Sequence, residues 1–117
     1  MTQRRRAIEL RDRILLDLHD LGMSVADVVS LHPEQICWTA RAVTVPVSDR
    51  AGTREVGETR RVLDPTTARR MEEYRLVRRA LRPRCGRFFV SDRGGQLSIV
   101  RVHEIHRERR QADEEGR

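Results

Sequence analysis

The sequence predicts a small α+β domain in which helices pack on a short antiparallel sheet. Apolar residues recur at helical spacing in residues 6–21, and they alternate with polar residues in residues 43–47. Helix-capping residues precede three further stretches, at Ser24, Asp64 and Ser98. The predicted order is helix, helix, two or three strands, helix, strand, helix, which is typical of an α+β domain.

The first two helices are predicted to meet at Gly22, which ends the first of them as a left-handed cap. Ser24 is followed by Asp27 three residues later, a capping-box-like start for the second helix. Pro33 should end that helix, because the residue before a proline avoids helical angles. The buried face of the first helix is predicted to be Ile14, Leu15, Leu18 and Leu21.

Residues 36–63 are predicted to form the sheet. Val43, Val45 and Val47 alternate with polar or non-helical residues, so one face of this strand should be buried. Pro46 lies within the strand and suggests an edge position. The polar stretch 48–59 then predicts a hairpin with a long flexible tip.

Asp64 and Pro65 predict the start of a third helix, which should run to about Leu81. After it, the sequence "RFFVS" predicts a short strand, and residues 92–95 predict a turn.

Ser98 is expected to cap a last helix that ends near Arg110. We expect one domain over residues 1–110 and a frayed, charged tail over residues 111–117.

The charge balance points to a polyanionic partner. All 24 basic residues are arginine, the net charge is +6 and the pI is about 11.0. Nucleic acid is the commonest partner of such a chain. Codon bias in a GC-rich genome explains the missing lysine, but it does not explain the excess of base over acid.

Cys37 and Cys85 lie far apart without metal-ligand spacing, so we expect buried thiols in a reducing compartment. No apolar run is long enough for a membrane span, and the first ten residues lack the apolar core of a signal peptide. The expected location is cytoplasmic, with no cofactor and no membrane partner.

Four stretches, in this order, resemble the front part of the catalytic domain of the tyrosine recombinases, the phage integrase family. They are "LRDRILLDLHDLGMSVADVVSLHPEQI", "AVTVPV…GETRRVLDPTTARRMEEY", "RFFVSDRGGQLS" and "SIVRVHEIHRE". The resemblance covers nearly all of this chain and the first half to two-thirds of the family's domain. It implies an integrase-like core and a role in DNA recombination or integration.

In that family a tyrosine attacks the scissile phosphate, while two arginines and a histidine stabilise the phosphoryl charge. A lysine on the hairpin protonates the leaving oxygen. Forked guanidinium groups suit the phosphoryl oxygens, and a lysine, unlike an arginine, can be tuned to donate a proton near neutral pH.

This chain departs from the pattern at Ser24, which stands where the family has its first arginine. We therefore interpret Ser24 as a helix cap, and we expect no guanidinium beside the Gly22 turn. The hairpin offers Arg50 and Arg54 but no lysine. The protein is expected to be a pseudoenzyme without catalytic residues.

Two other residues invite a catalytic interpretation. In "HEIHR", His103 and His106 suggest a metal only weakly, because two ligands without a third are poor evidence, so we interpret them as a solvated helix face. Tyr74 is the only tyrosine, and its spacing from Met71 and Leu81 predicts a half-buried packing residue.

DNA binding without cleavage is therefore the predicted function, with mostly backbone contacts to duplex DNA. The resemblance implies that these contacts lie at the hairpin tip and at the start of the last helix. The residues at these places are Arg50, Arg54, Arg93, Ser98 and Arg101. Residues 60–87 add ten arginines against three acids, a net charge of +7. The structural interpretation of this segment is a solvated helix face on which arginines pair with Glu72 and Glu73.

Three alternatives remain at this point. The first alternative is a protein-interaction module that binds or inhibits a full-length recombinase. The second is an integrase fragment without a function of its own. The third alternative is an enzyme that completes its site from another chain.

Overall fold

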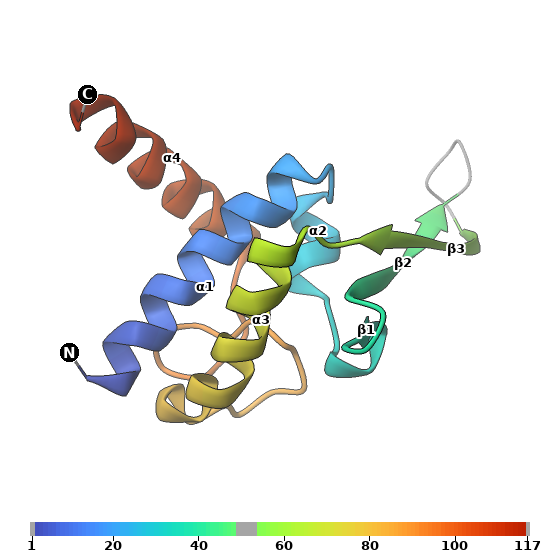
Figure 1. Ribbon diagram of the computed structural model, residues 1–117, viewed down its shortest axis with the longest axis horizontal. Helices are drawn as coiled ribbons and strands as arrows, with labels where there is room; N and C mark the ends of the chain where they lie inside the picture. The colour runs from blue at the N-terminus through green and yellow to red at the C-terminus, as the bar shows by residue number, and fades with distance from the viewer. Residues whose placement is uncertain (1, 49–53, 117) are drawn as a thin grey trace.

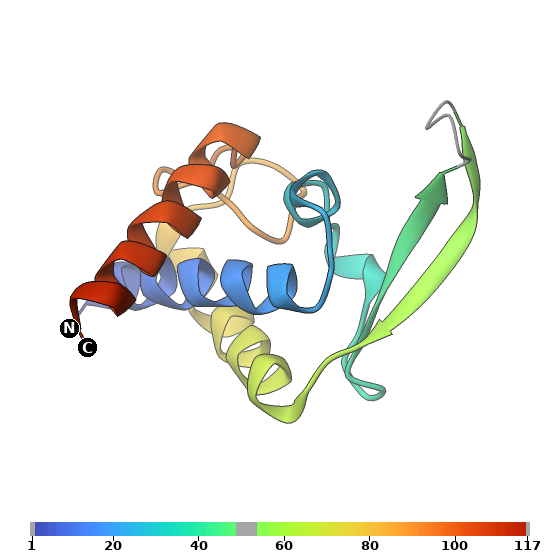
Figure 2. The same cartoon turned by 90° about the horizontal axis from the view of Figure 1, so that it is seen from above.

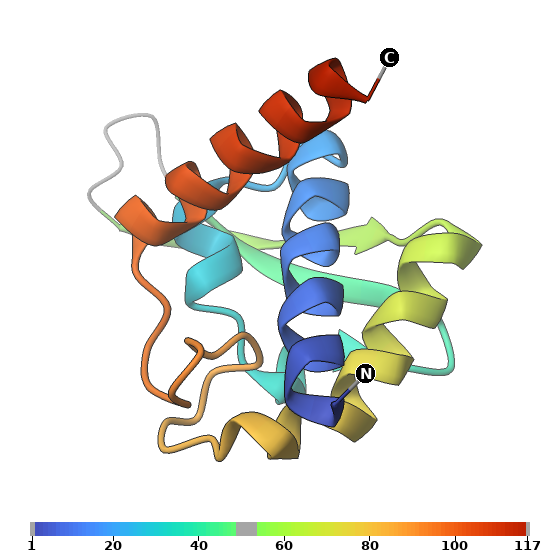
Figure 3. The ribbon, with the colours of Figure 1, turned by 90° about the vertical axis from the view of Figure 1, so that its left-hand side faces the viewer.

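The computed structural model describes residues 2–48 and 54–116 as a helical body with a β-hairpin extending from it (Figures 1 and 2). α1 (Gln3–Asp20) lies at the centre of the body, and α3 (Pro65–Val77) and α4 (Ile99–Glu115) pack on it. Figure 3 shows α4 crossing α1 obliquely, with the sheet behind. The predicted α+β class, with helices packed on a short antiparallel sheet, is confirmed. Within the described residues, no helix is both long and apolar enough to cross a bilayer.

The predicted helix pair at the amino terminus is confirmed. α1 ends at Leu21, and Gly22 follows with φ of +94°, a left-handed conformation that favours glycine. α2 (Val25–Val29) is short. It ends before Pro33, which instead begins the single 3₁₀ turn η1 (Pro33–Gln35).

The sheet has the order β1-β2-β3, formed by β1 (Ile36–Cys37), β2 (Ala42–Ser48) and β3 (Glu55–Val62), all antiparallel. The edge position predicted for Pro46 is wrong for the strand as a whole, because β2 is central. It holds locally, since β1 pairs only with Ala42 and Val43, and Pro46 faces β3 alone. The paired strands also resume at Glu55, so the loop is shorter than the predicted 48–59.

α3 continues through a 3₁₀ segment, η2 (Arg78–Leu81), as far as predicted. Tyr74 is fully buried rather than half-buried, because it packs between two phenylalanines. Its ring centroid lies 5.3 Å from that of Phe88 and 5.6 Å from that of Phe89.

The predicted strand "RFFVS" is wrong. Only an isolated bridge forms there, between Val90 and Gln96. The apolar run is explained by burial instead, since Phe88, Phe89 and Val90 are each at most 1% exposed. Periodicity cannot distinguish a buried loop of this length from a strand.

α4 begins after Ser98 as predicted, but it continues beyond Arg110 to Glu115. Residues 111–115 were expected to fray, and they are helical although exposed. Glutamine, alanine and glutamate are strong helix formers, which accounts for the extra turn.

A fully buried arginine ties α1 to the loop before α4. Arg11 is 0% exposed, and its Nε and Nη2 donate to Asp12 Oδ1 at 3.0 and 2.7 Å. Its Nη1 donates to the Val90 carbonyl at 3.1 Å and to Asp92 Oδ1 at 2.7 Å. Burial raises the pKa of Asp12, and the Arg11 charge opposes that rise. Arg11 thereby fixes the loop that carries several surface arginines.

Candidate nucleic-acid interface

Ser24 is a helix cap. Its Oγ accepts a hydrogen bond from the Asp27 backbone N–H at 3.1 Å, and its backbone is extended. The hydroxyl thus satisfies one of the donors that a helix start leaves free. The cap interpretation of Ser24 is confirmed.

Replacing Ser24 by alanine should lower the free energy of unfolding by about 1 kcal/mol, because the Asp27 N–H loses its partner. Urea denaturation of the two proteins measures this. Ser24→Asp is the matched control, since aspartate is an equally good cap and should retain the stability of the natural protein. Equal losses in both variants would contradict the capping role.

The expectation that no guanidinium lies beside the Gly22 turn is wrong. Arg61 reaches the turn from β3, and its Nη1 donates to the Leu21 carbonyl at 3.3 Å. A Cβ placed on Gly22 would lie 3.4 Å from the same Nη1. The Nε of Arg61 is buried without a hydrogen-bond partner among the described residues. Sequence reasoning missed this residue because only the strand register brings β3 to the end of α1.

The hairpin positions that were expected to contact DNA are only partly described. Arg50 lies outside the described residues, whereas Arg54 is exposed at the start of the returning strand. β3 is mostly exposed along its length. The hairpin also carries Glu55 and Glu58, which line a shallow pocket with Glu34. Its described part is therefore of mixed charge.

Five arginines meet around Asp92 and form what we call the arginine surface. They line two adjoining pockets that share Asp92 and Arg93. The five come from the start of α1, the end of η2, the following loop and the start of α4, and they are Arg4, Arg82, Arg84, Arg93 and Arg101. Two of the predicted contact residues, Arg93 and Arg101, belong to this surface.

Few acidic groups oppose this charge. Asp92 is the one carboxylate in the two pockets, and it is already paired with Arg11 at 2.7 Å. Arg101 has weaker partners, with its Nη1 3.3 Å from both Glu104 and Glu108. Arg82, Arg84 and Arg93 make no side-chain hydrogen bond or ion pair with any described residue. The surface thus presents several unneutralised guanidinium groups.

A close backbone approach holds the loop in place. The Arg84 N–H donates to the Gly94 carbonyl at 2.7 Å. Gly94 has φ of +83°, and a Cβ there would lie 2.1 Å from the Arg82 carbonyl oxygen, so no other residue fits. This contact brings Arg84 near Arg93, although the two are nine positions apart in the sequence. Arg4 joins them by donating to the Asp92 carbonyl at 3.1 Å.

Ser98, the remaining predicted contact residue, is exposed and caps α4 by accepting from the Arg101 N–H at 3.0 Å. The predicted set missed Arg4, Arg82 and Arg84. The excess of arginine within residues 60–87, which includes Arg82 and Arg84, was visible in the sequence, but which arginines lie at the surface was not.

About half of the ten arginines in residues 60–87 are held by the fold. Arg70 donates to the Asp17 carboxylate, and Arg61 donates to the Leu21 carbonyl. Arg78 and Arg87 donate to loop carbonyls. Arg75 lies over the Trp38 ring, with its Cζ 4.4 Å from the centroid. The excess of arginine therefore has both structural and surface parts.

The interpretation of "HEIHR" as a solvated face is wrong for one of its histidines. His103 is exposed, but His106 is only 6% exposed because it packs against α1. Cys37 likewise differs from its prediction, since it lies exposed on the edge strand β1. Among the described residues, no group of three or more histidine, cysteine or acidic side chains is placed to hold a metal ion.

No protein-family model, no curated protein and no solved structure matches this chain. The residues and their geometry alone therefore bear on its function.

Proposed function

We propose that this protein is a catalytically inactive, integrase-like DNA-binding protein that acts in DNA recombination or integration. The observation that carries DNA binding is the arginine surface, where five guanidinium groups from four segments meet around one paired carboxylate. The integrase-like assignment rests on the sequence resemblance. We also propose a cytoplasmic location, where the free Cys37 and Cys85 would stay reduced.

Phosphodiester groups are the ligands that such a surface fits. Guanidinium groups bind phosphate oxygens with two parallel hydrogen bonds, and their charge releases counterions from DNA. The hairpin, which projects from the helical body (Figure 2), would extend the contact, and the exposed Arg54 directly precedes its strand β3. Phosphate contacts carry no base information, so the proposed binding has little sequence preference.

The proposed lack of cleavage is supported by the state of the one tyrosine. Tyr74 is 0% exposed, and its Oη accepts from the Val90 N–H at 3.3 Å. Burial raises the pKa of its phenol, which disfavours the phenolate. No lysine is present to protonate a leaving oxygen. Arg61 places a guanidinium beside the Gly22 turn, but one of its donors already binds the Leu21 carbonyl.

Fluorescence anisotropy with labelled duplex DNA over a salt series tests the proposal. One phosphate contact for each of the four exposed arginines of this surface, Arg4, Arg82, Arg84 and Arg93, predicts that log affinity falls against log salt with a slope of roughly −3 to −4. Duplexes of unrelated sequence should bind within a few-fold of one another. Absence of binding at low salt would contradict the proposal.

A nicked duplex that traps covalent intermediates tests the lack of cleavage separately. We expect no covalent protein–DNA adduct under denaturing electrophoresis. An adduct that Tyr74→Phe abolishes would show that this protein cleaves DNA.

One observation favours the alternative of a recombinase-binding module. Ile99 and Val100 are 46% and 67% exposed at the start of α4, next to the arginine surface. Contiguous exposed apolar patches mark contact sites for other proteins, and this pair supplies two adjacent apolar side chains. Co-elution with a full-length recombinase that Val100→Asp abolishes, without any DNA binding, would favour this alternative.

A further inference from the structure

A second pocket lies away from the arginine surface, between the end of α1 and the middle of α4. Its volume is about 630 Å³. α1 contributes His19, and the exposed and buried faces of α4 contribute His103, His106, Arg107, Arg110 and Glu114. No function discussed above uses these residues.

The pocket contains a buried polar atom without a partner. His106 is 6% exposed, and its Nε2 has no hydrogen-bond partner among the described residues. Its ring centroid lies 4.9 Å from that of His19, with a tilt of 48° between the rings. Leaving a buried polar nitrogen unpaired is costly, so Nε2 is open to a partner such as a water, an ion or a ligand group.

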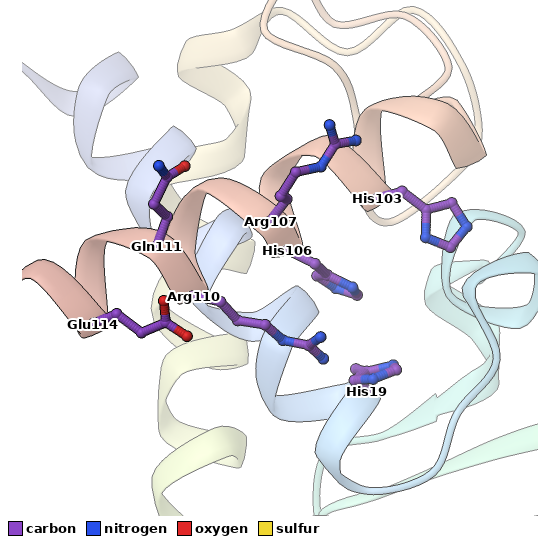
Figure 4. A pocket seen from close by; sticks show the side chains of 7 residues that line it. All are labelled: His19, His103, His106, Arg107, Arg110, Gln111 and Glu114. Carbon is purple, nitrogen blue, oxygen red and sulfur yellow. The ribbon is translucent and has the colours of Figure 1, made fainter.

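A guanidinium group completes the arrangement. Figure 4 shows the Arg110 side chain extending toward His19 and His106, whereas Arg107 points away from the two rings. Glu114 lies on the far side of Arg110 from the rings. Thus one permanent cation and two imidazoles converge on the same space.

We propose that His19, His106 and Arg110 form a binding site for a tetrahedral oxyanion of the phosphate type. Arg110 supplies charged donors, and the two rings supply one N–H each when His106 takes up a proton. The group bound is either a nucleic-acid phosphodiester or a free phosphate, because both present the same oxygens. This proposal goes beyond DNA binding and does not depend on it.

An oxyanion fits this pocket better than a metal ion. A structural transition-metal site needs about four ligands, and no third histidine, cysteine or carboxylate joins His19 and His106 within the described part of the chain. The guanidinium that approaches the rings would also repel a divalent cation. The same guanidinium attracts an anion.

Binding should be linked to a proton. Burial lowers the pKa of His106, and His19, Arg110 and His103 lower it further, while the Leu15 carbonyl raises it. The free protein therefore holds the ring neutral near pH 7, and an anion at Nε2 favours the protonated ring. Of the neighbouring helices, α1 contributes His19 to the pocket wall. α2 also contacts α4, but none of its residues lines the pocket.

Calorimetric titration with sulfate tests the proposal, because sulfate stays doubly charged over the pH range used. We expect sulfate affinity to rise by up to tenfold for each unit that the pH falls from 7.5 to 5.5. Arg110→Gln should weaken binding at least tenfold, and the matched control Arg107→Gln, with the same charge loss, less than twofold. His19→Gln should also weaken binding, and His106 ring nitrogen shifts in NMR spectra should report proton uptake on sulfate addition.

Several results would overturn the proposal. Equal losses in Arg107→Gln and Arg110→Gln would indicate diffuse attraction, and pH-independent affinity would remove the role of His106. Zn²⁺ binding that His19→Gln abolishes would make the pair a metal site instead. Duplex DNA separates the two sources, since a phosphodiester site predicts that Arg110→Gln also weakens DNA binding and a free-phosphate site predicts no change.

Discussion

Replacing Arg11 by alanine should lower the free energy of unfolding by about 3 to 5 kcal/mol. The guanidinium is 0% exposed and donates to two carboxylates and one carbonyl. Its loss would leave Asp12, which is 8% exposed, as a buried charge with no close partner, because the Arg109 Nη2 lies 4.0 Å from it. Guanidinium chloride denaturation followed by circular dichroism gives the value.

Arg13→Ala is the matched control on the same helix. Its side chain is 48% exposed and lies 3.6 Å from Asp17, so its removal should cost less than about 1 kcal/mol. A second variant identifies the cause. The double variant Arg11→Met/Asp12→Asn should have a higher free energy of unfolding than Arg11→Met alone, because the uncompensated charge of Asp12 is removed. A cost for Arg11→Ala as small as that for Arg13→Ala would contradict the buried network.

Tyr74→Ala should cost about 3 to 5 kcal/mol, because it opens a cavity among Phe88 and Phe89. Tyr74→Phe keeps the ring and should cost about 1 to 3 kcal/mol, since the Val90 N–H loses its acceptor. The control is Leu76→Ala on the exposed face of α3, where the side chain is 66% exposed and the expected change is within about 0.5 kcal/mol.

Tyr74 also gives a direct optical readout, because it is the only tyrosine. Burial raises the pKa of its phenol, so phenolate absorbance should appear above the usual pH of about 10. The folded state holds the neutral phenol of Tyr74. Its contribution to the free energy of unfolding is therefore complete below a pH of about 10 and is lost as the pH rises through the pKa of the folded protein. Titration at the ordinary pKa in the folded protein would place Tyr74 at the surface.

Local signals allowed the helix starts to be predicted. Ser24, Asp64 and Ser98 each accept from the backbone N–H three residues later, at 3.1, 3.4 and 3.0 Å. Capping depends on the neighbouring residues alone, so the sequence contains all of the information. The same holds for Gly22, whose positive φ follows from its position after an apolar helix.

The features that sequence reasoning missed depend on distant segments. Arg11 resembles a surface arginine in sequence, and it is buried only because the 90–92 loop offers it acceptors. Arg61 reaches the Gly22 turn because of strand register, and His106 is buried because α4 crosses α1. None of these contacts leaves a periodic pattern.

The candidate site divides in the same way. Arg93 and Arg101 were predicted from the family resemblance, which points to the turn and the start of the last helix, and both belong to the arginine surface. Arg4, Arg82 and Arg84 join them only through the close approach at Gly94 and the contact of Arg4 with the Asp92 carbonyl. An excess of arginine predicts a polyanionic partner, but the fold decides which arginines can meet it.

The measurement that most directly tests the central claim compares the salt dependence of DNA binding in two variants. Arg84→Gln/Arg93→Gln removes two members of the arginine surface, and Arg69→Gln/Arg79→Gln removes the same charge from α3 and η2, where both arginines are exposed. We predict that the first pair makes the slope of log affinity against log salt shallower by about 2, and the second by less than about 0.5. Equal changes in the two pairs would show that the arginine surface is not where this protein contacts DNA.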